Sequence, residues 1–184
     1  MIRLIAPLLA LLLALPAAAQ FSGVDPLKGA AQKAAEAAKA KGKQTANEKV
    51  EKRVNARLLA EGRKNQCTFK TNSDEFEGKC DDKVRRLYSA LVDAKKVLVQ
   101  SGVSGFRFEV AGHTDTTGVA AKNKALSEKR AARIVDELKK KGIPSGEIVA
   151  VGKGSDEPLV KPDDTPAKRA RNRRYEIQAR LQMP

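Results

Sequence analysis

Hydrophobic residues recur along this chain at two spacings, every three to four residues in some segments and every second residue in others. The first spacing is typical of a helix with one buried face, and the second of a strand with one buried face. Helical spacing predicts helices at Asp81–Gln100 and at about Val119–Lys141. Alternation and short apolar runs predict strands at 66–69, 106–111, 147–151 and 175–181. Thr165 and Pro166 are typical of the cap and first residue of a short further helix.

The order of these elements is β-α-β-α-β, followed by a short helix and a closing strand. Strands that alternate with helices predict an α/β fold, here an α+β two-layer sandwich with a mixed sheet. The segment before the first strand has a different amino-acid composition and is expected to be a helical tether with a lead-in helix.

The first nineteen residues are expected to be a signal peptide, removed before Gln20. Arg3 supplies the positive start, Leu4–Leu15 the apolar stretch, and Ala17–Ala19 the small residues of a cleavage site. An uncleaved N-terminal anchor is the alternative. No cysteine follows the apolar stretch as a site for lipid attachment, and no later segment is long and apolar enough to cross a membrane. We therefore expect an exported mature chain without a transmembrane segment.

Residues 20–62 are predicted to form a separate segment ahead of a domain at 63–184. Lys28–Lys43 is almost entirely Ala, Lys, Gln and Glu, which predicts an exposed, marginal helix. Val50, Val54, Leu58 and Leu59 then predict an amphipathic lead-in helix that ends near Gly62 and docks on the domain. Its apolar repeat is too short for a coiled coil.

The chain carries a formal net charge of +14, which loss of Arg3 lowers to +13. Such a balance favours polyanionic partners, and export makes nucleic acid an improbable one. Acidic polymers of the cell envelope and phosphorylated lipid headgroups remain as candidates. The alternative is that much of the charge only solvates a lysine-rich helix.

Cys67 and Cys80 are the only cysteines, and they lie close together in an exported chain. An even count at short spacing predicts a local disulfide in an oxidising compartment. Two thiols and one distant histidine do not make a metal site, and nothing near either thiol suggests a catalytic base. We expect no metal and no cofactor.

Asp115 stands at the carboxyl end of a predicted strand, and Arg130 lies fifteen residues later in the following helix. One carboxylate and one guanidinium in a strand-to-helix crevice suit a zwitterion, whose ammonium would meet Asp115 and whose carboxylate would meet Arg130. The alternative is a structural salt bridge between the two. His113 lacks a nucleophile or second carboxylate at a suitable spacing, so we expect packing rather than catalysis.

Several motifs in order resemble the OmpA-like C-terminal domain across about residues 64–181. They are Ala111–Asp115 with Gly118, Asn123, Leu126-Ser127 with Arg130-Ala131, Gly142-Ile143-Pro144, Val151-Gly152 with Gly154, Pro158, and Arg169 with Asn172–Ile177. Each motif alone is a weak signal, whereas the ordered set is specific.

The resemblance implies a non-catalytic domain that binds peptidoglycan by holding the free end of meso-diaminopimelate in the stem peptide. It maps the family's acid and arginine onto Asp115 and Arg130, and supporting positions onto Asn123, Thr117 and Asn72. The basic run that contains Arg169, Arg173 and Arg174 is expected to support the same crevice. Lys70 departs from the family, which more often has an acid there.

The sequence therefore predicts a periplasmic protein of a Gram-negative bacterium, associated with the cell wall and peripheral to the outer membrane. It is expected to anchor or organise the envelope, with its N-terminal helices as a candidate contact for an envelope protein. The alternative is a basic periplasmic adaptor with the same fold that binds protein or anionic envelope lipid.

Overall fold

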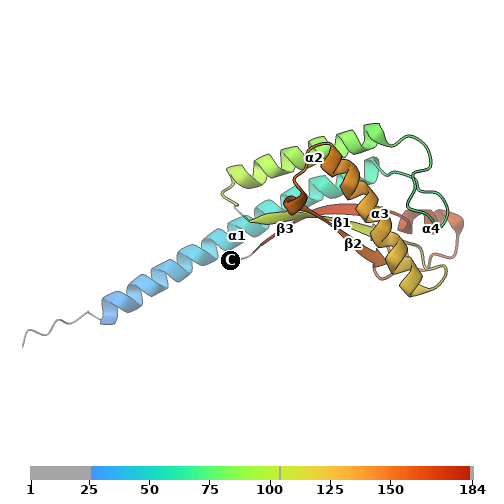
Figure 1. Cartoon of the computed structure of the whole chain (residues 1–184). Helices are drawn as coiled ribbons and strands as arrows, with labels where there is room; N and C mark the ends of the chain where they lie inside the picture. Colours follow the sequence, from blue (N-terminus) through green and yellow to red (C-terminus); the bar gives the residue numbers. More distant parts are fainter. Residues whose placement is uncertain (1–25, 104, 183–184) are drawn as a thin grey trace, which may run out of the picture. The chain divides into compact units, whose positions relative to one another are not determined.

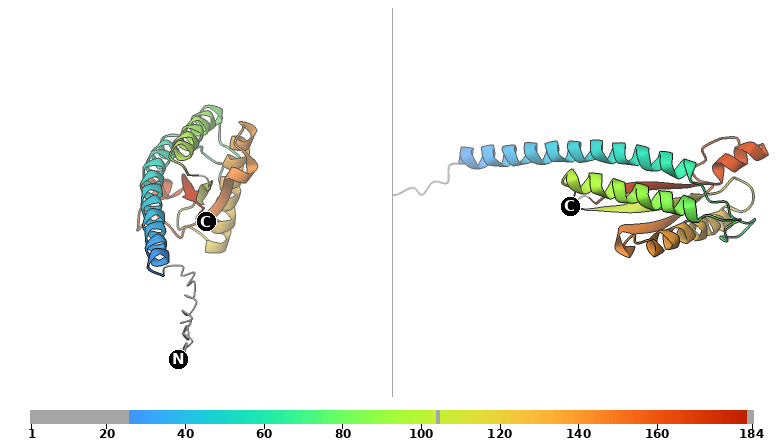
Figure 2. Two further views of the ribbon diagram at one scale, coloured as in Figure 1. Left: turned by 90° about the vertical axis from the view of Figure 1, so that its left-hand side faces the viewer. Right: turned by 90° about the horizontal axis from the view of Figure 1, so that it is seen from above.

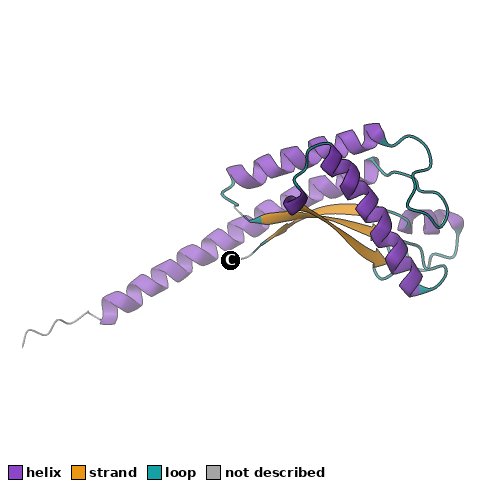
Figure 3. Cartoon of the chain, in the orientation of Figure 1, coloured by secondary structure: helices purple, strands orange, loops and turns teal. Residues whose placement is uncertain are grey.

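The computed structural model describes residues 26–103 and 105–182, so the predicted signal peptide lies outside the described residues. Four helices, three strands and one 3-10 turn follow one another along this part of the chain (Figures 1 and 3). They are α1 (Pro26–Lys64), α2 (Asp81–Gln100), β1 (Phe106–His113), α3 (Ala120–Lys140), η1 (Ser145–Glu147), β2 (Ile148–Gly154), α4 (Pro166–Asn172) and β3 (Tyr175–Leu181). The prediction of a mixed α/β fold is confirmed.

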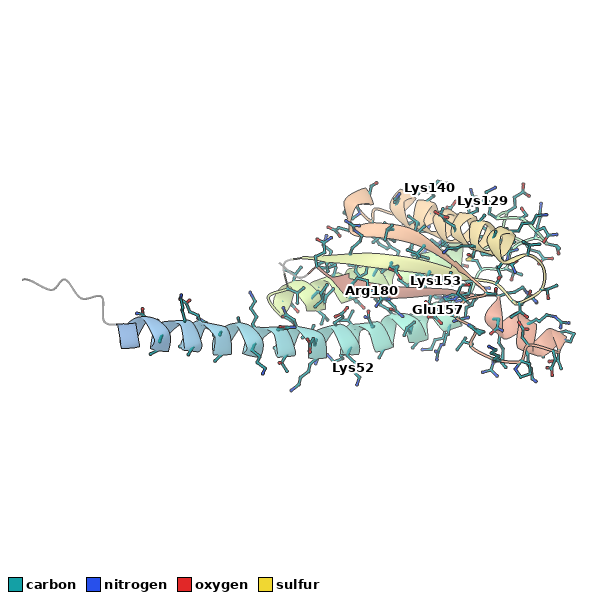
Figure 4. The ribbon with its side chains drawn as sticks, turned by 90° about the horizontal axis from the view of Figure 1, so that it is seen from below. Lys52, Lys129, Lys140, Lys153, Glu157 and Arg180 are labelled. Atoms are coloured by element: carbon teal, nitrogen blue, oxygen red, sulfur yellow. A yellow bond between two sulfur atoms is a disulfide. The ribbon has the colours of Figure 1, made fainter. Side chains whose placement is uncertain are left out.

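The sheet has the order β2-β1-β3. The central strand β1 is parallel to β2, with Phe108 opposite Ile148, and antiparallel to β3, with Val110 opposite Ile177. Helices α2 and α3 cover one face of the sheet, while Figure 4 looks onto the opposite face, where Lys153 and Arg180 lie. The architecture is therefore one layer of strands and one layer of helices.

The hydrophobic core lies between these two layers. Residues that alternate along the strands meet residues spaced by three or four along the helices, as their patterns predict. The largest of these buried side chains are Phe108, Val110 and Ile177 from the strands, Val84, Leu87, Leu91 and Leu98 from α2, and Ile134 and Leu138 from α3. Val54 and Leu58 of α1 belong to the same core, as expected for a lead-in helix that docks on the domain.

The predicted strand at Gln66–Phe69 is wrong. Phe69 forms only an isolated bridge with Phe76, and the outer edge of β3 is instead bordered by the last turns of α1 (Figure 2). The alternation of residues 66–69 is genuine, but α1 runs on to Lys64 and leaves too little chain to reach along β3.

Two side-chain amides make the hydrogen bonds to β3 that a neighbouring strand would otherwise make. One belongs to Asn55 in α1, and the other to Gln66 just after the end of this helix. Asn55 donates to the carbonyl of Ala179 (3.0 Å) and accepts from its N–H (2.7 Å). Gln66 does the same at Tyr175, at 2.8 and 3.0 Å. Between them, Gly62 lies beside β3, where a Cβ would make an ordinary van der Waals contact of 3.9 Å with the Ile177 nitrogen. The edge of β3 is thus satisfied by a helix rather than by a strand.

The segments predicted as a helical tether and a lead-in helix lie on one continuous helix, because α1 runs from Pro26 to Lys64. Thr45 donates its hydroxyl to the Lys41 carbonyl one turn earlier, so this residue continues the helix rather than ending it. By its contacts the chain divides into two units, Met1–Ala40 and Lys41–Pro184. The second half of α1 therefore belongs to the same unit as the sheet, while the proposed boundary at 62/63 stays a prediction.

Smaller differences concern element ends. β2 begins one residue later than predicted, because Glu147 lies in η1, and it extends through Gly152 to Gly154. This extension depends on Gly152, where a Cβ would lie 2.5 Å from the Lys124 carbonyl oxygen of α3. Thr165 caps α4 by accepting from the Lys168 N–H, as predicted.

Candidate functional site

The candidate site is built where β1 and β2 end. The Thr114 N–H donates to the Gly154 carbonyl (2.8 Å), and the His113 N–H donates to the Arg174 carbonyl (2.8 Å). These bonds hold the end of β1 from both sides. The next residue, Asp115, is consequently presented at the carboxyl ends of two parallel strands, where open α/β sheets bind ligands.

The turn that follows Asp115 is fixed by side chains from two sides. Asn123 donates to the carbonyls of Asp115 (3.3 Å) and Thr117 (3.0 Å). From the other side Asp163 accepts from the backbone N–H of Thr116 (2.9 Å) and from its hydroxyl. These hydrogen bonds, chiefly the one from the Thr116 hydroxyl, lower the pKa of Asp163 to about 2, so this carboxylate stays charged in the folded protein. Asn123 and Thr117 thus shape the turn after Asp115, while their part in ligand binding stays a prediction.

The carboxylate of Asp115 has two partners. It accepts from the Thr117 N–H (3.1 Å) and from Arg173 (2.7 Å), and only 14% of its side chain is exposed. Arg130 is not one of its partners, so the alternative of a structural Asp115–Arg130 salt bridge is wrong. Sequence spacing could not have identified Arg173 as the partner, because it lies on a different element 58 residues away.

Arg130 is held by the loop between α1 and α2 instead. Its guanidinium donates to the carbonyls of Ser73 (2.9 Å) and Lys70 (3.1 Å), and it lies 5.2 Å from the centre of the Phe69 ring. Burial, followed by the positive charge of Arg173, lowers the pKa of Arg130. Its charge has no carboxylate partner among the described residues, which leaves it available to an anionic ligand.

The loop that holds Arg130 is itself closed by a disulfide between Cys67 and Cys80, whose Cα atoms are 5.7 Å apart. Inside this loop the Phe69 and Phe76 rings lie 5.2 Å apart. Asn72 is exposed and has a positive φ of 52°, which marks the tip of the turn. The predicted disulfide is therefore present, and it closes the loop that supplies the carbonyl partners of Arg130.

These residues surround a single open cleft of about 980 Å³. Its lining brings together the residues that the sequence predicted for ligand binding: Asp115, Arg130, Asn123, Thr117 and Asn72, with Cys67, Arg169, Arg173 and Arg174. The three arginines differ in role. Arg174 is occupied by Glu176 (2.7 Å), and Arg169 donates to two backbone carbonyls, so both brace the wall, while Arg173 reaches Asp115.

Two further arginines of the cleft were not named as site residues from the sequence, although Arg171 belongs to the basic run that was expected to support the crevice. Arg63, in the last turn of α1, and Arg171, on α4, line it without an ion pair in the described part of the chain. The sequence does contain a hint of both, because Arg63 is followed by Lys64 and Arg171 lies within the basic run 168–174. The lining therefore contains six arginines, against Asp115 and Glu77, and favours a ligand with more negative than positive groups.

His113 was predicted to have a packing role, and the structure buries it to 2% exposure. Neither ring nitrogen has a hydrogen-bond partner, and burial, together with the charge of Arg174, lowers its pKa to about 4. Neither nitrogen is therefore hydrogen-bonded to a hydroxyl or thiol in the described part of the chain. Within residues 26–103 and 105–182, no three His, Cys, Asp or Glu side chains gather as metal ligands, and no helix is long and apolar enough to cross a bilayer.

A two-layer α/β domain with a charged cleft at the carboxyl ends of its strands defines a ligand-binding domain. The model of the OmpA family matches residues 68–173, more than half of the chain. The chain therefore belongs to the OmpA family.

Its relatives share this region. Outer membrane porin F of Pseudomonas fluorescens is 46% identical over 74 residues, which are 40% of this chain and 22% of that protein. Peptidoglycan-binding protein ArfA of Mycobacterium tuberculosis is 41% identical over 71 residues, 39% of this chain and 22% of the relative. The chain thus spans less than a quarter of the length of these proteins.

Among solved structures, the peptidoglycan-associated lipoprotein from Burkholderia pseudomallei has the same fold, with a TM-score of 0.52 at 21% identity. That match covers 64% of this chain and 92% of the lipoprotein chain.

Proposed function

We propose that this protein binds peptidoglycan without catalysis and anchors or organises the cell envelope from the periplasm of a Gram-negative bacterium. Family membership supports the class of ligand, since one relative is named as a peptidoglycan-binding protein and a structural neighbour as a peptidoglycan-associated lipoprotein. The observation that carries the proposal is the presence of Asp115 and Arg130 in one cleft.

The ligand group that suits this cleft is the free end of meso-diaminopimelate in the stem peptide. Its ammonium pairs with the Asp115 carboxylate, and the neighbouring carboxylate pairs with the Arg130 guanidinium, which has only carbonyl partners in the described part of the chain. Charge-assisted hydrogen bonds of this kind contribute about 1.5–3 kcal/mol each. A neutral glycan offers neither group.

Co-sedimentation with purified sacculi tests this proposal. Asp115→Ala and Arg130→Ala should each abolish sedimentation while circular dichroism stays close to wild type. Arg133→Ala is a matched control, because Arg133 lies on the same helix over the Phe76 ring and outside the cleft. If both site variants still sediment like the wild type, the assignment of the site is wrong.

Competition identifies the part of peptidoglycan that is bound. Free meso-diaminopimelate or a stem peptide should displace the protein from sacculi, and chitin oligomers should not. Equal displacement by both would point to a glycan groove instead.

The second candidate is a basic adaptor that binds protein or anionic envelope lipid, and the six arginines of the cleft favour it. The two candidates differ in their response to salt. Binding through a patch of positive charge to a polyanion weakens steeply as salt rises, whereas a site that holds one ammonium and one carboxylate is less sensitive. Sacculus binding measured between about 50 and 500 mM salt separates them.

A further inference from the structure

The Asp115 carboxylate already has a cationic partner. Arg173 donates to it at 2.7 Å, and 46% of the Arg173 side chain is exposed against 14% of that of Asp115. A ligand ammonium that reaches Asp115 therefore meets a guanidinium in the same place. Binding has to include the fate of this ion pair, since two cations compete for one carboxylate.

Arg173 is also a neighbour of Arg130. Both line the cleft, and the charge of Arg173 is one cause of the lowered pKa of Arg130. The hydrogen bonds of Arg130 go to carbonyl groups, and the charges of Asp115 and Asp74 both act on its guanidinium. Of these two carboxylates, Asp115 is the one that also pairs with Arg173. When a ligand ammonium takes over Asp115, Arg173 loses its carboxylate partner while it stays close to the guanidinium of Arg130.

A carboxylate attached to the same carbon as the ammonium resolves this conflict. It arrives beside Asp115 together with the ammonium, and it can accept hydrogen bonds from two guanidiniums at once. We propose that Arg173 exchanges partners on binding, so that Asp115 pairs with the ligand ammonium while Arg173 joins Arg130 on the adjacent carboxylate. This inference rests on the proposed function and makes Arg173 a specificity-determining residue.

The exchange predicts which amines the cleft accepts. The end of a diaminopimelate side chain carries an ammonium and a carboxylate, whereas a lysine side chain carries an ammonium alone. With lysine, the Arg173–Asp115 ion pair is broken and Arg173 gains no new partner. Arg173 therefore favours diaminopimelate and disfavours lysine, although both supply the same ammonium.

The test uses two stem tripeptides that differ only in diaminopimelate or lysine at the third position. Their dissociation constants are measured with the full-length mature protein, as wild type and as Arg173→Ala. Arg173→Ala should weaken the diaminopimelate peptide about tenfold, the loss of one charge-assisted hydrogen bond, and should bind the lysine peptide more tightly than the wild type does. The dissociation constant of the lysine peptide divided by that of the diaminopimelate peptide should therefore fall at least tenfold.

Arg171→Ala is the matched control, since Arg171 lines the cleft but makes no ion pair in the described part of the chain. It should weaken both peptides only slightly, and it should lower the preference for the diaminopimelate peptide far less than Arg173→Ala does. Arg173→Gln, which keeps most of the side-chain length without the charge, gives a second variant if Arg173→Ala folds poorly.

An unchanged ratio in Arg173→Ala overturns the inference and reduces Arg173 to a general positive charge. Tighter binding of both peptides also overturns it, because Arg173 would then only obstruct Asp115. A lysine peptide that remains undetectable with both Arg173 variants has the same meaning. Failure of the proposed function itself looks different: the wild type binds neither peptide, or Asp115→Asn binds diaminopimelate as the wild type does.

Discussion

At the scale of single residues, the site depends on glycines that allow α3 to approach the sheet. A Cβ at Gly112 would lie 2.1 Å from the Ser127 carbonyl oxygen, and this atom belongs to the backbone and cannot rotate away. The same turn of α3 carries Ser127, whose hydroxyl accepts from the Gly154 N–H beside the end of β1. The close contact between Gly112 and Ser127 therefore sets the position of α3 relative to the ends of β1 and β2, where the site lies.

Gly112→Ala should lower the free energy of unfolding by roughly 3 kcal/mol or more, because overpacking forces the backbone of α3 to move. Urea unfolding measures the loss. Gly146→Ala is the control, since a Cβ at Gly146 meets nothing within 4 Å. Similar stabilities for the two variants would contradict the close-contact argument.

The buried His113 predicts how stability responds to pH. Its pKa is about 4 in the folded protein against an ordinary value of 6.5, so between these values the unfolded chain binds more protons. Stability should therefore be complete above pH 6.5 and fall as the pH drops toward 4, by about 1–2 kcal/mol at pH 5.

His113→Phe should remove this part of the pH dependence. The measurement is urea unfolding of both proteins at pH 7.5 and pH 5. Because the sequence contains a single histidine, parallel pH profiles for the wild type and the variant would show that the imidazole is not the cause.

The residues that could be predicted from the sequence are those whose place follows from local order. Asp115 ends a strand and Arg130 lies on the next helix, so both were placed correctly in one cleft. The pairing of Asp115 with Arg173 could not be predicted, because it depends on how α4 and the turn after it return to the end of β1. The contacts of Arg130 depend likewise on the shape of the disulfide loop.

At the scale of elements, the unexpected feature is a helix on the edge of the sheet. Asn55→Ala should leave both backbone groups of Ala179 without a partner and cost roughly 1–3 kcal/mol. Thermal unfolding is the measurement. Gln44→Ala is the control, because Gln44 lies on the same helix and bonds only to Glu48. Equal melting temperatures would mean that β3 does not need this helix.

The disulfide loop is the second element with a direct link to the site. Reduction should lower stability by about 3 kcal/mol in the chain-entropy description, and should also weaken binding, because the loop supplies the carbonyl partners of Arg130. Cys67→Ser/Cys80→Ser under non-reducing conditions should behave like the reduced wild type. Full affinity in that variant would separate the loop from ligand binding.

Helix α2 and strands β1 and β3 could be predicted because their hydrophobic periods match the structure closely. The strand at 66–69 was mispredicted for a physical reason: its alternation resembles that of an edge strand, yet a side-chain amide of Gln66, not its backbone, pairs with β3. Local pattern cannot distinguish these two ways of satisfying an edge.

At the scale of the whole molecule, the division at residue 40 predicts which part of α1 the domain needs. A chain that begins at Lys41 should keep the melting temperature and sacculus binding of the mature protein, because Val54 and Leu58 remain in the core. A chain that begins at Lys64 loses both core residues and Asn55, and should be strongly destabilised. Equal stability of the two chains would contradict the role given to this helix.

The covered edge of β3 has a consequence for assembly between molecules. In the described part of the chain the sheet ends with β2 on one side and with a strand bordered by α1 on the other. A sheet that can add strands on both sides can grow into an open-ended fibre, while one with a single accessible edge can only form closed pairs. Edge-to-edge association of this protein should stop at two copies, so that a high local concentration does not lead to polymerisation.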